Sequence, residues 1–121
     1  MKALDSIREY CLSLPDVTEK IQWEDVLLFC VRGKIFVMVS LNPASKDRIC
    51  FKCDAETFAE LLERDGAHPA AYVGRFKWIG LSDFNILPVG DLRELIRASY
   101  ELVLAKLPKK KTGRRTARPL R

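Results

Sequence analysis

Two cysteines three residues apart, Cys50 and Cys53 in the stretch RICFKCDAE, have a spacing that could support chemistry. A C-x-x-C motif can hold a metal ion or carry out thiol–disulfide exchange. In an extended strand, however, the two Cα atoms would lie about 10 Å apart, whereas a disulfide needs less than about 7 Å. An offset of three also places the two side chains on opposite faces of a sheet. We therefore expect two structural cysteines in different surroundings.

Other uses of this pair remain open but have less support. If the helix that begins at Asp54 bends Cys53 out of the strand, the helix N-terminus would stabilise a thiolate, and the acids Asp54 and Glu56 would oppose that effect. A zinc site would need a second pair of ligands. The remaining candidates have no paired spacing; they are Cys11, Cys30 and His68.

A catalytic site finds little support elsewhere in the sequence. His68 precedes a proline, and no serine or cysteine beside it forms an evident nucleophile pair, although triads can assemble from distant positions. The adjacent acids Glu24 and Asp25 would point apart in a strand. The phosphate-binding, dinucleotide-binding and H-E-x-x-H motifs are absent. We expect no catalytic residue, no metal site and no cofactor, and we do not predict an enzyme.

The elements around these residues are predicted from apolar periodicity. Helical spacing over residues 3–14 ends at Pro15. Two apolar runs, 25–31 and 35–41, meet at Arg32-Gly33 and predict a β-hairpin. The other predicted elements are an edge strand around Glu19–Trp23, a strand at 48–53, a helix at 55–65 between the cap Asp54 and Gly66, a strand at 76–81, and a helix that starts after Asp91 in a capping box with Glu94 and ends at Pro108.

This order predicts an α+β fold, in which a single antiparallel sheet of about four to five strands packs with three helices. The hairpin strands are almost continuously apolar, which predicts cover on both faces or one face buried in a dimer. We expect one domain over residues 1–108 and a disordered basic tail over 109–121. No apolar run is long enough to cross a membrane, and residues 1–5 do not resemble a secretory leader, so we expect a cytoplasmic protein.

The positive charge is concentrated in the tail. The chain has 21 Lys and Arg and 16 Asp and Glu; seven cations and no acid fall in 109–121, so residues 1–108 carry a net charge of −2. Such a tail would attract polyanions in a salt-dependent, sequence-independent manner. Its cations are Lys109, Lys110, Lys111, Arg114, Arg115, Arg118 and Arg121.

Four further cations stand beside turns or aromatic residues and could contact phosphates or bases. Arg32 and Lys34 flank the hairpin turn, and Arg75 and Lys77 alternate with aromatic residues in RFKW. The opposing interpretation is that these turns are merely solvated, which the negative body charge favours.

Several stretches together resemble the MmcQ/YjbR family of small bacterial proteins, from about residue 5 to 108. They are CLSLPDVTEKIQWEDVLLFCVRGKIFVMVSL, FKCDAE, AAYVGRFKWIGL and DLRELIRASYELVLAKLP, and their order and spacing carry the resemblance. The recurring residues are Leu14-Pro15, Gly33-Lys34-x-Phe36, Lys52-Cys53-Asp54, Trp78 and Ser99-Tyr100.

The resemblance implies an α+β domain with loops described as a double wing, and hence the DNA-binding label usually given to the family. It implies no reaction, cofactor or catalytic residue. Our first hypothesis is therefore a DNA-binding protein in which the tail and the wing loops contact phosphates largely without sequence preference. The alternative is a protein-interaction module or homodimer without nucleic-acid binding. A small-molecule site near Trp78 and His68 ranks last.

Overall fold

The computed structural model describes residues 2–71 and 73–107. The predicted disordered tail at 109–121 lies outside the described residues. In chain order, the elements are α1 (Lys2–Ser13), β1 (Val17–Gln22), β2 (Val26–Val31), β3 (Lys34–Ser40), β4 (Ile49–Lys52), α2 (Ala55–Leu61), β5 (Ala67–Pro69), a 3-10 turn η1 (Gly74–Phe76), β6 (Trp78–Leu81) and α3 (Val89–Ala105).

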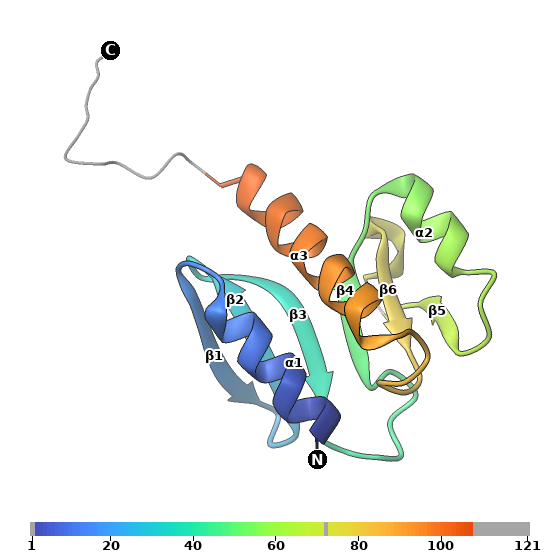
Figure 1. Ribbon diagram of the computed structural model, residues 1–121, viewed down its shortest axis with the longest axis horizontal. Coiled ribbons are helices and arrows are strands. Elements are labelled where there is room, and N and C mark those ends of the chain that lie inside the picture. Colours follow the sequence, from blue (N-terminus) through green and yellow to red (C-terminus); the bar gives the residue numbers. More distant parts are fainter. Residues whose placement is uncertain (1, 72, 108–121) are drawn as a thin grey trace, which may run out of the picture.

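The described strands form one antiparallel sheet with the order β1-β2-β3-β4-β6-β5. Helices α1 and α3 lie against one face of this sheet, and α2 packs beside β6 (Figure 1). The predicted α+β class with three helices is confirmed. The sheet has six strands instead of the four to five expected, because residues 67–69, expected to be loop, form the edge strand β5.

The predicted hairpin of β2 and β3 is present. The backbone angles of its turn explain why a glycine stands there. Arg32 and Gly33 both have positive φ, +48° and +88°, as a two-residue hairpin turn of the type I′ kind requires. The register then shifts between Phe29, which faces Val37, and Cys30, which faces Ile35. The extra residue in β3 is Phe36, so this β-bulge lets consecutive side chains of β3 enter the core.

The core lies between the sheet and the two long helices. Helix α1 contributes Ile7 and Cys11, and Leu14 directly after its last residue continues the predicted helical spacing into the core. Helix α3 contributes four core side chains, those of Leu92, Ile96, Tyr100 and Val103. The largest fully buried side chains of the sheet are aromatic, namely those of Phe29, Phe36 and Phe51.

Several predicted boundaries require correction. Helix α3 begins at Val89 after Pro88, whose side chain can form no cap, so the predicted Asp91 capping box is wrong; Asp91 lies in the first turn. Helix α2 begins at its predicted cap, where Asp54 accepts a 2.7 Å hydrogen bond from the Thr57 backbone N–H. It ends at Leu61 instead of residue 65. The chain turns over the residues that follow and reaches Gly66, which has a positive φ. Strand β6 starts at 78 instead of 76, after the 3-10 turn.

None of the described helices is both long enough and apolar enough to cross a membrane.

Candidate functional site

The sheet topology gathers cations at one end of the strands. Strand β3 begins at Lys34, next to the hairpin turn, and runs antiparallel to β4, which ends at Lys52. Lys52 in turn faces Trp78, the first residue of β6. The turn, the end of β4 and the segment before β6 therefore lie together. We call this region, with the end of α3, the cationic end; its residues are Arg32, Lys34, Lys52, Arg75, Lys77 and Lys106.

Lys52 and Lys106 form the centre of this cationic end. Burial lowers the pKa of the half-buried Lys52 ammonium below its ordinary value, and the adjacent Lys106 side chain lowers it further. The ammonium groups are therefore close enough to repel each other, and Lys106 is itself exposed. Two like charges held together in the folded state favour an added anion between them. Neither residue is among the cations predicted from the sequence to contact a ligand, although Lys52 stands in the K-C-D stretch.

Three of the four predicted body cations are exposed at this end: Lys34, Arg75 and Lys77. The Lys77 ammonium lies 5.7 Å from the centre of the Phe58 ring of α2, and the Arg75 guanidinium lies 4.8 Å from the centre of the Phe76 ring. These rings orient the two cations while leaving them accessible to solvent.

Arg32, the fourth predicted cation, has a more structural position. It is half-buried, and its backbone N–H donates a 3.2 Å hydrogen bond to the Asp16 carbonyl oxygen. Its charge also acts on Tyr100, whose pKa is raised by burial and by Asp16 and lowered in part by Arg32. Arg32 therefore contributes less accessible charge than Lys34.

The acids near this end include Asp16 before β1, Asp54 and Glu56 at the start of α2, and Glu101 of α3, which acts on Tyr100 as Asp16 and Arg32 do. Hydrogen bonding to the Thr57 backbone N–H lowers the pKa of the Asp54 carboxyl, so Asp54 is engaged as a helix cap. The described part of α3 also finishes here, so the chain enters the seven-cation tail from the cationic end. The tail residues named above lie outside the described residues.

The C-x-x-C pair separates as predicted. Cys53 belongs to the core beneath the helices, whereas Cys50 points to the opposite face of the sheet and lines a hollow there. Burial, with the nearby Asp47 carboxylate, raises the pKa of Cys50 to about 12, and burial together with Asp54 raises that of Cys53 to about 12. Each thiol is thus held in its neutral form, which is a poor nucleophile and metal ligand.

His68 has a partner that sequence spacing could not reveal. Its Nε2 contacts the Asp47 carboxylate, and the two side chains are only 21% and 15% exposed. Strand β6 runs between β4 and β5 and places Gly80 directly beside His68. A side chain at position 80 would collide with the carboxylate, so the glycine makes this contact sterically feasible. Within the described residues, no cluster of three or more metal-binding side chains occurs.

Comparison with known proteins identifies the family. The YjbR family model matches residues 12–102. The chain belongs to the YjbR family. The fold of this YjbR chain is also similar to the crystal structure of a Deinococcus radiodurans protein with the family domain DUF419, with a TM-score of 0.70 and 24% sequence identity over 85% of this chain and 79% of that one. No curated protein matches the sequence at a significant level.

Proposed function

We propose that this YjbR protein binds nucleic acid, chiefly DNA, through the phosphate backbone, using the cationic end and the adjoining tail. The observation that supports this most strongly is the Lys52–Lys106 pair, because the fold holds two ammonium groups together at the cost of mutual repulsion. A phosphate placed beside both groups would remove this cost. Turns that only face solvent would give no reason for the two ammonium groups to be placed side by side.

The surrounding elements have a suitable arrangement for a backbone contact. The β2–β3 turn carries Lys34, and the segment before β6 carries Arg75 and Lys77, so the loops of two separate hairpin-like units flank the end of α3 (Figure 1). The exposed Phe76 ring beside Arg75 adds a surface on which an unpaired base could stack. Lysines contact phosphates as point charges and read little sequence, so the binding is expected to be largely sequence-independent.

Salt dependence provides the first test. Each phosphate contact contributes a slope of about −0.9 to log K against log salt for duplex DNA. We expect the full chain to bind a short duplex at low salt with a steep slope, measured by fluorescence anisotropy of a labelled duplex over a salt series. No binding at low salt would rule out the proposal.

A charge-matched pair of variants tests the location of the contact. The triple variant Lys34→Gln, Lys77→Gln, Lys106→Gln removes exposed cations of the cationic end. The control triple Lys20→Gln, Lys46→Gln, Arg64→Gln removes the same charge from exposed sites elsewhere. We expect at least a tenfold loss of affinity and a shallower slope in the first variant, and a much smaller change in the control. Equal losses would indicate attraction by net charge alone.

The contribution of the tail is tested separately by replacing its seven Lys and Arg residues with glutamine. If the cationic end takes part, this variant retains a weakened, salt-dependent affinity that the Lys34, Lys77 and Lys106 replacements then abolish. If binding disappears with the tail charges alone, the folded body makes no contribution.

A further inference from the structure

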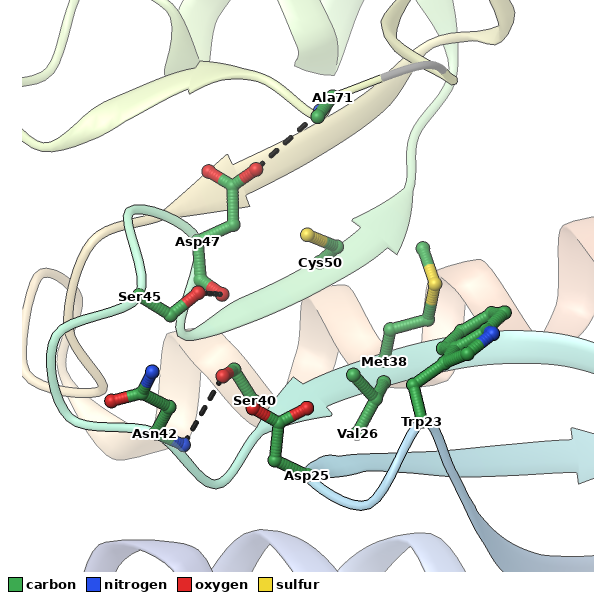
Figure 2. A pocket seen from close by; sticks show the side chains of 10 residues that line it. All are labelled: Trp23, Asp25, Val26, Met38, Ser40, Asn42, Ser45, Asp47, Cys50 and Ala71. Atoms are coloured by element: carbon green, nitrogen blue, oxygen red, sulfur yellow. Dashed lines mark hydrogen bonds between the residues drawn. The ribbon is translucent and has the colours of Figure 1, made fainter.

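A hollow of about 290 Å³ opens on the face of the sheet that α1 and α3 leave uncovered, at the end of the strands opposite to the cationic end. The β1–β2 turn forms one wall, and the loop between β3 and β4 forms another (Figure 2). Its floor is the sheet itself, where Met38 and Cys50 are direct cross-strand neighbours. The lining residues used below are Trp23, Asp25, Met38, Asp47 and Cys50.

Asp47 supplies a fixed carboxylate at one side of this hollow. One of its oxygens contacts His68, and the other accepts a 3.4 Å hydrogen bond from the Ala71 backbone N–H. The space above Gly80 allows the carboxylate to occupy this position. The charge of Asp47 also reaches Cys50, because it raises the pKa of that thiol. The negative potential of Asp47 therefore extends into the hollow.

Asp25 supplies a second carboxylate from the β1–β2 turn. Figure 2 shows Asp25 and Asp47 on different sides of the hollow, with the Asp47 carboxylate turned toward Ala71 and with Trp23 and Met38 together on the side nearer to Asp25. Within residues 2–71 and 73–107, the Asp25 carboxylate makes neither a hydrogen bond nor an ion pair, although its backbone oxygen accepts a 2.7 Å bond from Leu41. The Asp47 carboxylate is already in contact with His68, so the Asp25 charge is the one without a partner among the described residues.

Trp23 supplies an aromatic wall that is available for binding. It is 72% exposed, an unusual state for the largest apolar side chain, and it stands in a turn where both Trp23 and Glu24 have positive φ. Together with Met38 it offers an apolar surface, and an indole is also the best aromatic partner for a cation. Contact with a ligand would remove part of this surface from water.

The charge of the hollow decides what class of molecule it can take. No lysine or arginine is among its described lining residues, and the exposed Lys46 beside Asp47 in sequence is not one of them. An anion would face two carboxylates, and a purely apolar molecule would desolvate them without compensation. A cation with an apolar body matches both the acids and the Trp23–Met38 surface.

We infer that this hollow binds a small organic cation, a primary ammonium on an apolar body. The ammonium group lies beside the Asp25 carboxylate, on the side of the hollow that faces Asp47, and the body packs against Trp23 and Met38. At about 30 Å³ per small group, the volume accommodates on the order of ten non-hydrogen atoms. The site is independent of nucleic-acid binding, because it lies at the other end of the strands.

The test uses the full chain with Trp78→Phe, which leaves Trp23 as its single tryptophan. The probe is 2-phenylethylamine, titrated at pH 7 and followed by Trp23 fluorescence. Its neutral counterpart, 2-phenylethanol, has nearly the same shape without the charge. We expect a saturable change with the amine and at least tenfold weaker binding of the alcohol. Equal binding of the two, or no saturable change with either, would overturn the inference.

Two variants in the same turn locate the charge that is responsible. Asp25→Asn should weaken amine binding at least tenfold. Glu24→Gln removes one charge from the neighbouring exposed residue outside the hollow and should leave the affinity nearly unchanged. An equal effect of both variants would indicate attraction by the turn as a whole and contradict the site.

The cations of the tail are a competing occupant, and the variant with a neutralised tail distinguishes them. If amine binding has similar affinity with and without the tail charges, the hollow is a site for free small molecules. If binding appears only after the tail is neutralised, the tail itself occupies the hollow, and the inference is wrong.

Discussion

The hydroxyl group of Ser99 in α3 donates a 2.7 Å hydrogen bond to the backbone oxygen of Phe36 in β3. The same hydroxyl accepts a 2.9 Å bond from the backbone N–H of Lys52 in β4. Strands β3 and β4 are paired only over three residues, and beyond the pair Val37–Phe51 the Ser99 side chain takes the place of the missing ladder bonds. A fully buried serine therefore joins the two halves of the sheet to the helix that crosses them (Figure 1).

Replacing Ser99 with alanine should destabilise the protein by about 1–3 kcal/mol, because it removes the partner of two backbone groups that water cannot easily reach. Urea unfolding monitored by circular dichroism measures the change. Ser13→Ala is the control, since the Ser13 hydroxyl also bonds a backbone oxygen, that of Tyr10, but at an exposed position. It should cost less than about 0.5 kcal/mol. Similar losses in the two variants would show that the junction contributes little.

Alanine at position 80 should lower the stability of the protein, whereas alanine at position 90 should raise it. A Cβ at position 80 would collide with the Asp47 carboxylate and displace it from His68, which should cost about 1–3 kcal/mol. A Cβ at position 90 meets nothing within 4 Å and lies in the first turn of α3, where alanine should stabilise by up to about 1 kcal/mol. Chemical denaturation of both variants tests this difference. An unchanged free energy of unfolding in Gly80→Ala would contradict this prediction, because loss of the Asp47–His68 contact would then cost little.

Much of the fold could be predicted because its signals are local. The helical period of α1, the positive-φ glycine of the β2–β3 turn and the Asp54 cap each act within a few residues. Strand β5 was missed because three residues containing a proline carry no alternation, and it exists only by pairing with β6. The start of α3 was misplaced because Pro88 provides no side-chain cap to read.

The sites depend on contacts that spacing does not encode. Lys52 and Lys106 lie at the ends of different elements, and only the crossing of α3 over the sheet brings them together. Asp47 and His68 meet because β6 inserts between β4 and β5 and places a glycine beneath the carboxylate. The sequence singles out several cations and one histidine, whose functional roles stay predictions, and the partners of these residues follow from strand order.

Neutralising Lys106 should stabilise the protein while weakening its binding to polyanions. Its neighbour lowers the pKa of Lys52, so the folded state disfavours the charged form of Lys52 at neutral pH. Lys106→Gln should relieve this cost by about 0.2–0.5 kcal/mol at low salt, a gain typical of removing one like-charged neighbour. The gain should shrink as pH rises through the pKa of Lys52, where that ammonium loses its proton, and also in high salt.

Thermal unfolding of Lys106→Gln over pH and salt, beside duplex binding, measures both effects. Lys46→Gln, at an exposed site outside the cationic end, is the matched control and should change neither stability nor affinity by a comparable amount. A loss of stability in Lys106→Gln would contradict the repulsion between the two lysines.

The cysteines should react slowly with a thiol reagent as long as the protein is folded. Burial raises the pKa of Cys11, Cys50 and Cys53 to about 12 in each case, and it raises that of Cys30 as well. At pH 8 the thiolate fraction at pKa 12 is roughly a thousandfold below that of an ordinary cysteine. A colorimetric disulfide reagent should therefore modify the native chain slowly and all four thiols rapidly in denaturant. Rapid native modification of Cys50 or Cys53, located by mass spectrometry of the labelled peptides, would restore the C-x-x-C stretch as a reactive site.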